Sequence, residues 1–370
     1  MATTTTDEWA ILEQLLPDGW REQARTTGAF RRARYLDDPA VLLRLLLLHA
    51  VNDRGLRETV AKAEAAGLAK LSPVALFFRL RTSAQWLAWI ASELARLLRT
   101  DAPSAGGLRL RAVDSTTVQG PASKTSDWRL HYSLDLRELA CDWCELTDGT
   151  VPEALERVPV APGDVLVADR AFGRVPGVRH VVEAGGHVLV RLRWRHARLD
   201  DERGRRVRAL TLARRLRVGQ VGDWPVRLHV PKGRPIPGRI VAIRLPHALA
   251  ERNVHRVHLR AVRQQRIRTD PRTVEAARYV LLFTTLPSAK IAAKTITEIY
   301  RFRWQIELAF KRHKQILRLG RLPHKDAEAA KGWILAKLVI ALLLERLYRN
   351  AVAISPWGYR VESSRPQAAA

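Results

Sequence analysis

A glutamate surrounded by cations and a phenol is the feature of this sequence most suggestive of chemistry. Between 300 and 314 the sequence places five side chains at spacings that fall on one narrow helical face, since each residue of a helix turns by about 100°. These residues are Tyr300, Arg303, Glu307, Lys311 and Lys314. One interpretation is a solvated face, because i,i+4 ion pairs contribute only about 0.2–0.5 kcal/mol each. The other is a site for a phosphate-bearing ligand or a metal ion.

One long helix is predicted to position this face. The sequence contains no Gly or Pro after Ser288 until Gly320, which could serve as N-cap and C-terminal stop respectively. A separate apolar stripe is expected to press the helix against a core. It consists of Ile299, Phe302, Ile306, Phe310 and Leu317.

Two aspartates follow short apolar runs that predict strands. Asp114 comes after 108–113, and Asp169 comes after Val165-Leu-Val-Ala168. If each strand ends at its aspartate, the two carboxylates can lie at one rim of a sheet. The alternative is ordinary turn chemistry, because Asp is common where a strand ends.

The sequence motifs of these three segments resemble those of the cut-and-paste DDE transposases of the insertion sequence 4 family. Tyr300, Arg303, Glu307 and Lys314 have the spacing of that family's Tyr-Arg-Glu-Lys signature, within an Arg-Trp-x-Ile-Glu-x-x-Phe-Lys phrase. Asp114-Ser115-Thr116 and Asp169-Arg170-Ala171-Phe172 are similar to its two aspartate phrases. Ala171 and Phe172 depart from the common Gly and Tyr, which removes a hydroxyl but leaves the carboxylate.

The resemblance implies a metal-dependent enzyme that cleaves DNA and transfers 3′ hydroxyl ends. It assigns Asp114, Asp169 and Glu307 as catalytic metal ligands for two Mg²⁺ ions, with Mn²⁺ as a substitute. Two cations about 3.5–4 Å apart can stabilise both the attacking and the leaving oxygen, and Mg²⁺ needs few protein carboxylates. The predicted DNA-binding residues are Tyr300, Arg303, Lys311, Lys314, Arg170 and Trp194.

Composition agrees with a polyanionic partner. The 370 residues carry a formal charge of +26, with cations spread along the whole chain. DNA, RNA or an anionic membrane would satisfy this charge, but no apolar run is long enough to cross a bilayer. The N-terminus lacks the features of a signal peptide. We therefore expect a cytoplasmic, nucleoid-associated protein that binds the ends of a DNA element and target DNA as a homodimer, with no membrane partner.

The expected fold class is α/β, with an RNase H-like catalytic core interrupted by a β-rich insertion and preceded by an α-helical DNA-binding region. The predicted parts are 1–105 (helical, DNA-binding), 106–185 (first part of the core), 186–286 (insertion), 287–355 (C-terminal core helices) and 356–370 (loose tail). A glycine-containing linker, 101–107, marks the first boundary. The N-terminal helices could form a helix-turn-helix-like module or a bundle whose cations, including Arg54, only solubilise it.

Alternating Val- and Arg-rich runs predict strands through the insertion, among them 187–194, 239–244, 255–262 and 279–284. Trp194 could stack on a displaced base or belong to a core. A last helix over 328–350 is expected to cover the sheet.

The two cysteines, Cys141 and Cys144, form a C-x-x-C pair. A structural zinc site needs four ligands, and no second pair is evident. Two reduced thiols are the favoured interpretation over a redox site. The functional alternative to a transposase is a catalytically silent, transposase-derived DNA-binding protein.

Overall fold

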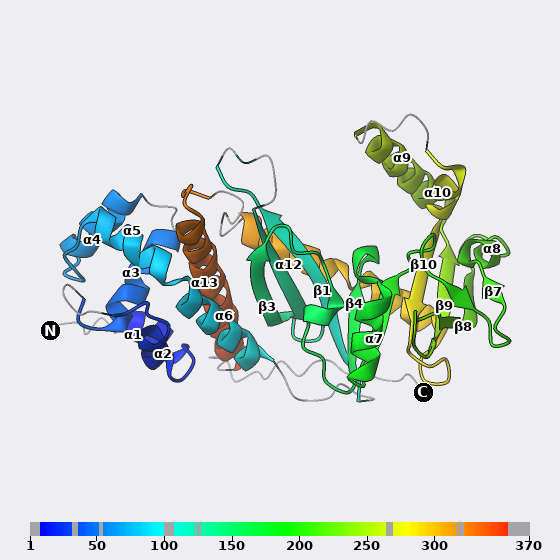
Figure 1. Ribbon diagram of the computed structural model, residues 1–370, viewed down its shortest axis with the longest axis horizontal. Coiled ribbons are helices and arrows are strands. Elements are labelled where there is room, and N and C mark those ends of the chain that lie inside the picture. Colours follow the sequence, from blue (N-terminus) through cyan, green and yellow to red (C-terminus); the bar gives the residue numbers. More distant parts are fainter. Residues whose placement is uncertain are drawn as a thin grey trace.

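A computed structural model gives the fold of residues 8–353, except for 32–35, 52–54, 100–106, 122, 124–126, 264–268, 316–317 and 319–321. Several predicted features lie outside these residues. They are Arg54, most of the linker 101–107, Leu317, Gly320 and the tail 356–370. The described part is a mixed α/β structure, built on one long sheet with helices grouped at one end and on its faces (Figure 1).

The sheet has ten strands in the order β3-β2-β1-β4-β5-β10-β9-β8-β6-β7. In the first five strands, β1 pairs antiparallel with β2 and parallel with β4, and β4 pairs parallel with β5. The strands are β1 (Arg109–Val118), β2 (Trp128–Asp135), β3 (Ala140–Asp148), β4 (Asp164–Ala168), β5 (His187–Arg191), β6 (Leu199–Asp200), β7 (Arg206–Val207), β8 (Val221–Leu228), β9 (Ile236–Arg244) and β10 (Tyr279–Thr284).

The region predicted as an insertion continues this sheet rather than forming a sheet of its own. β10 pairs antiparallel with both β5 and β9, so the strands after β5 extend the edge that β5 would otherwise leave open. The small helices α8 (Ala209–Ala213) and α10 (Pro271–Ala276) lie at this end.

The strand predicted over 255–262 is wrong, because these residues belong to helix α9 (His247–Arg263). The short window alternates Val and polar residues, which favoured a strand. Over the whole segment the buried residues are Ala250, Val254 and Ala261, spaced by four and seven residues as on a helix.

The predicted helix through 300–314 is also wrong in one respect, since it is two helices. α11 (Ala293–Arg301) and α12 (Trp304–Gln315) are separated at Phe302 and Arg303, and the N-cap of α11 is Ala292, not Ser288. Around the break the hydrogen bonds run from residue i to i−3, as in Phe302 to Ile299 and Ile306 to Arg303. The sequence has no Gly or Pro at this point to signal a break.

The break changes part of the predicted apolar stripe. Ile306 and Phe310 are buried as expected, whereas Phe302 is 53% exposed at the corner between the two helices.

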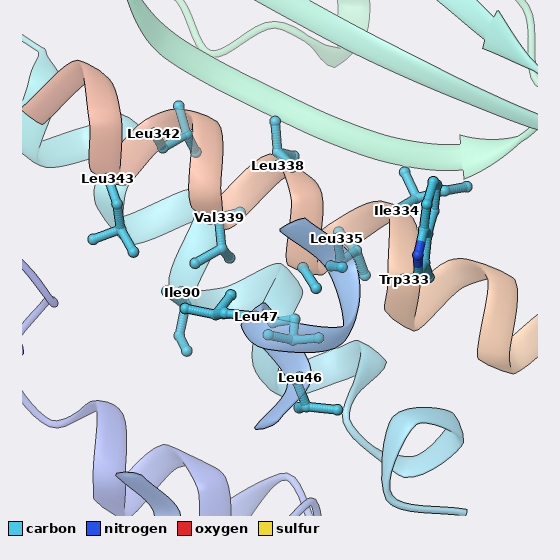
Figure 2. Packing of buried hydrophobic residues seen from close by; sticks show 14 of the residues in the cluster. Leu46, Leu47, Ile90, Trp333, Ile334, Leu335, Leu338, Val339, Leu342 and Leu343 are labelled. Atoms are coloured by element: carbon cyan, nitrogen blue, oxygen red, sulfur yellow. The ribbon is translucent and has the colours of Figure 1, made fainter. Parts of the chain in front are cut away.

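The N-terminal helices share one core with the last helix. α13 (Ala327–Ala353) packs against α3, α5 and α6, and its apolar side chains meet Leu46, Leu47 and Ile90 (Figure 2). α13 also contacts the sheet, since Glu345 accepts hydrogen bonds from the Cys141 backbone N–H and the Tyr132 hydroxyl. The first helices are α1 (Glu8–Gln14), α2 (Trp20–Thr26), α3 (Pro39–Val51), α4 (Leu56–Ala65), α5 (Pro73–Thr82) and α6 (Ala84–Leu98).

Both cysteines are buried and free. Burial raises the pKa of the Cys141 thiol well above its ordinary value, so it is not a reactive thiolate. Among the helices that the structure describes, none combines the length and apolar character needed to cross a membrane.

Candidate active site

Two neighbouring parallel strands bring Asp114 and Asp169 to adjoining positions. The register of β1 and β4 ends with Val113 opposite Ala168, and each aspartate is the next residue of its strand segment. Asp169 follows the end of β4, as predicted. Asp114 does not end its strand, because β1 continues to Val118 by pairing with β2.

Both aspartates share a sheet face with α11 and α12. Alternation along the strands puts Asp114 on the side of Ala112, whose apolar cluster includes α12, and Asp169 on the side of Val165 and Val167, which pack with α11. The face is therefore covered by the two helices that carry the tyrosine, arginine and glutamate.

Arg303 joins the first aspartate to the glutamate. Its Nη1 lies 3.4 Å from Asp114 Oδ2, and its Nη2 donates to Glu307 Oε1. The Arg303 side chain is only 17% exposed, whereas Glu307 is 57% exposed. Because Arg303 sits at the break between α11 and α12, it can reach the strand as well as its own helix. The guanidinium thus stands between two carboxylates.

Asp114 holds its proton more tightly than an ordinary aspartate. Burial is the main cause, and the negative charges of Glu153 and Asp169 add to it, raising the pKa of Asp114 to about 6. The Ser115 backbone N–H, which donates to Asp114 Oδ1 at 2.8 Å, and the charge of Arg303 oppose the shift. A cation bound beside Asp114 would therefore favour the charged form that burial disfavours.

Tyr300 lies beside the second aspartate. Burial, followed by the charge of Asp169, raises the pKa of the Tyr300 phenol to about 12, while Arg303 and Arg191 oppose the shift. The phenol is therefore protonated at neutral pH and can donate a hydrogen bond. Desolvation and the charge of Arg191 lower the pKa of Arg170, the residue after Asp169.

The remaining predicted DNA-binding residues are more scattered. Lys311 and Lys314 are exposed on α12. Trp194 is half-buried against the apolar cluster under β5 and β10, and the Arg195 guanidinium carbon lies 5.1 Å from its ring centroid. Trp194 is thus partly a core residue.

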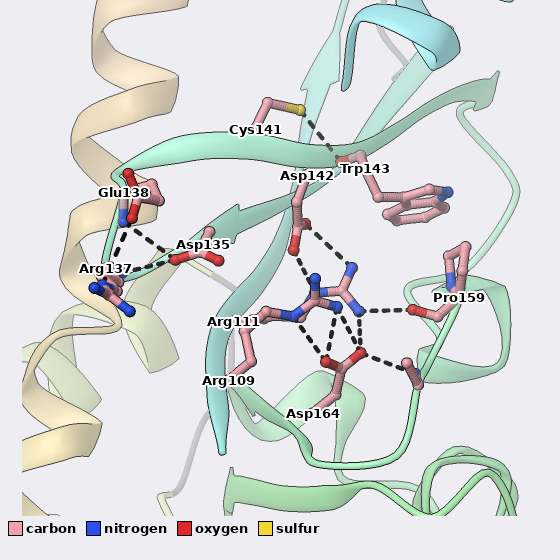
Figure 3. A network of polar contacts seen from close by, with 11 residues as sticks. Arg109, Arg111, Asp135, Arg137, Glu138, Cys141, Asp142, Trp143, Pro159 and Asp164 are labelled. Carbon is pink, nitrogen blue, oxygen red and sulfur yellow. Dashed lines mark hydrogen bonds and ion pairs between the residues drawn. The ribbon is translucent and has the colours of Figure 1, made fainter. Parts of the chain in front are cut away.

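A buried ion-pair network fixes the strand that carries Asp114. Arg111 donates to Asp142 of β3 at 2.5 and 3.1 Å and to Asp164 of β4 at 2.9 Å (Figure 3). Arg109 makes two further hydrogen bonds with Asp164, at 2.8 and 2.9 Å. Arg111 and Asp142 have no exposed side-chain surface, so the buried network ties β1 to the adjacent β4 and, across β2, to β3 three residues before Asp114.

Sequence reasoning missed one acidic residue close to the site. Glu153, in the connection after β3, accepts hydrogen bonds from the Ser115 hydroxyl at 2.7 Å and from Arg129 at 3.1 Å. It lies in an irregular segment with no motif, so only the tertiary structure brings it near Asp114.

The carboxylates do not form a ready-made metal site. Within the described residues no three His, Cys, Asp or Glu side chains lie together as a cluster that could hold an ion. Asp114 and Asp169 are adjacent, whereas Glu307 is linked to Asp114 through the Arg303 guanidinium, which contacts both carboxylates.

Comparison with known proteins places these residues in a family. The family model for the transposase DDE domain matches residues 147–344, which include Asp169 and Glu307, while Asp114 lies before the match. The transposase for insertion sequence element IS421 from Escherichia coli is 35% identical over 358 residues, covering 95% of this chain and 96% of the relative. A protein named InsL, of element IS186A in Escherichia coli (strain K12), is 35% identical over 357 residues with the same coverage.

Among solved structures, the piggyBac transposase synaptic complex with hairpin DNA has a TM-score of 0.48 at 10% identity, covering 95% of this chain and 74% of that chain. This value does not establish a shared fold. The family match and the two relatives, which extend over nearly the whole chain, do establish kinship. The chain belongs to the DDE transposases of the insertion sequence 4 family and is a DNA transposase.

Proposed function

We propose that this transposase binds the ends of its insertion sequence, cleaves the DNA by metal-dependent hydrolysis and transfers the 3′ hydroxyl ends into target DNA. The observation that carries the proposal is the convergence of Asp114, Asp169, Tyr300 and Arg303 under α11 and α12. These residues come from three distant parts of the sequence, and their charges act on one another.

Asp114, Asp169 and Glu307 are the residues we assign to two Mg²⁺ ions, which Mn²⁺ could replace. Bound divalent ions would neutralise the scissile phosphate and activate the attacking oxygen. The raised pKa of Asp114 favours this assignment, because a bound cation would stabilise the charge of a carboxylate that is buried and adjoins Asp169. A cation that takes Oε1 of the exposed Glu307 would have to displace the Arg303 guanidinium from it.

We assign the surrounding cations and the phenol to DNA. Tyr300 stays protonated and can donate a hydrogen bond to a phosphate oxygen. Arg303, released from the carboxylates, could form a bidentate contact with a phosphate. Lys311, Lys314 and Arg170 are exposed and would add charge contacts, and Trp194 could offer the free part of its ring to a base.

We also propose an RNase H-like catalytic core made by β1 to β5, in which β5 (His187–Arg191) comes from the start of the predicted insertion 186–286 and the rest of that segment widens the sheet. In its favour, β2 is the only antiparallel strand in the order β3-β2-β1-β4-β5. The helices before β1 would bind the element ends, and a homodimer on DNA would hold two ends together. In the cell we expect the protein in the cytoplasm, associated with the nucleoid.

The proposal is tested with a DNA duplex containing an element end joined to flanking DNA. The parent protein should cut it at the junction with Mg²⁺ or Mn²⁺ and should not cut it with a chelator. Asp169→Asn should bind the same duplex but not cut it, because the amide removes one negative charge from the metal site.

Glu298→Gln is the matched control, since Glu298 is an exposed residue of α11 with no assigned role. This variant should cut like the parent. Selective binding without metal-dependent cutting by the parent would favour the alternative, a catalytically silent DNA-binding protein.

A further inference from the structure

Helix α9 projects away from the sheet above β10, where it packs on α10. In Figure 1 it rises with α10 above the same edge toward which β1 runs. The helix is held by a shallow contact, because its buried residues are Ala250, Val254 and Ala261 and it packs on α10. Asn253 secures it with a hydrogen bond from its side chain to the Ala277 carbonyl at 3.3 Å. Most of its surface is left open.

The open side of α9 carries a row of arginines. Arg252, Arg256, Arg260 and Arg263 are all exposed and are spaced by four, four and three residues, which puts them on the face opposite the buried stripe. At about 1.5 Å per residue, the row is about 16 Å long. None of the four makes an ion pair within the part of the chain that the structure describes. The one acidic residue of α9, Glu251, pairs with Arg278 instead, at 3.6 Å.

The C-terminal part of the row lies within electrostatic range of Arg170. The positive charge of Arg260 acts on Arg170, which directly follows Asp169. Arg191 of β5 acts on Arg170 as well, so cations from three different elements gather near the residue that follows Asp169. Four guanidiniums without ion-pair partners among the described residues make this open face strongly positive, and an anionic partner would relieve their mutual repulsion.

From this arrangement we infer that α9 is an arm that lies along the DNA backbone beside the cut, with its four arginines contacting phosphates. The inference rests on the proposed function, because it takes the bound polyanion to be the DNA that the active site cuts. DNA presents one charge per about 3.4 Å of each strand, so the row is about as long as five base-pair steps. Contacts to phosphates would hold the DNA in place without reading its sequence.

The test is the salt dependence of DNA binding. The duplex with the element end and a random duplex of equal length are titrated at several salt concentrations, with a chelator present. The variant changes Arg252, Arg256, Arg260 and Arg263 to Gln, which removes charge but keeps a good helix former. If all four contact phosphates, the slope of log K against log salt should fall in magnitude by about 3.6 on both duplexes.

A control variant removes the same charge elsewhere. It changes Arg203, Arg206, Arg215 and Arg217 to Gln; these exposed residues lie at the β6–α8 end of the sheet, away from β1 and β4. Its slope should match that of the parent. A variant with two changes, Arg256→Gln and Arg263→Gln, should give about half of the full reduction in slope. It still tests the inference if the variant with four changes misfolds.

An unchanged slope in both α9 variants, or an equal reduction in the control, would overturn the inference. The measurement needs no cleavage, so this result would count against α9 alone. Failure of the parent to cut DNA with metal would instead count against the proposed function.

Discussion

Replacing Asp114 by Asn should stabilise the metal-free protein at neutral pH while abolishing its chemistry. The native state raises the pKa of Asp114 from 3.8 to about 6. Between these two values the folded protein binds more protons at this site than the unfolded chain. The contribution of Asp114 to the free energy of unfolding is therefore fully present below about pH 4. It is lost as the pH rises to about 6 and stays lost above that.

The shift sets the size of the effect. The difference, 6 − 3.8 = 2.2 units, corresponds to about 3 kcal/mol at 1.36 kcal/mol per unit. Asn can still accept the Ser115 N–H, and the attraction of Arg303, whose guanidinium lies 3.4 Å from Asp114, is already included in the shift. We expect a gain of about 3 kcal/mol in the free energy of unfolding at pH 7.5 and no gain at pH 4.

Urea titrations of both proteins with a chelator, at pH 4 and pH 7.5, measure this difference. Asp270→Asn is a control, because the hydrogen bonds of Arg272 and the neighbouring Arg195 lower the pKa of that exposed carboxyl; it should gain nothing at pH 7.5. An Asp114→Asn protein that is less stable than the parent at pH 7.5 would refute the reasoning. Mg²⁺ should then stabilise the parent but not the variant.

Three further predictions follow from the same contacts. In a luminescence titration without DNA, Arg303→Gln should bind Tb³⁺ more tightly than the parent protein does, because the ion need not displace a guanidinium from Asp114 and Glu307. Weaker binding by the variant would contradict this. Asp142→Ala should lower the free energy of unfolding by about 3 kcal/mol in urea titrations, since it leaves the buried Arg111 with only one of its two carboxylate partners; a loss under about 1 kcal/mol would contradict this. Tyr300→Phe should keep the parent's pH profile of cleavage below about pH 10, because the pKa of that phenol is about 12; loss of an alkaline limb would contradict this.

The sequence predicted the helices and strands of the site better than the breaks and contacts between them. β4 and β10 were found because apolar runs with clear boundaries determine them locally. The break at Phe302 and Arg303 has no local signal. There Arg303 reaches a strand nearly two hundred residues earlier in the chain, a contact that periodicity cannot reveal.

Division of the chain was harder to predict. A composition change at 101–107 separates helices from strands, yet α13, at the other end of the sequence, shares the core of those first helices (Figure 2). Burial of α13 depends on partners far away in sequence, such as Leu46 and Ile90. For α9, the short alternating window outweighed a longer helical period, and only burial of its alanines distinguishes the two.

The most direct test of the central claim is a paired assay of Glu307→Gln. The variant keeps the shape of the side chain but loses the charge that a metal ligand needs. We expect no Mg²⁺-dependent cleavage of the element-end duplex, together with DNA affinity equal to or slightly above that of the parent, because one negative charge near the phosphates is gone. Cleavage by Glu307→Gln at near the parent rate would contradict the assignment of this glutamate, and with it the catalytic triad.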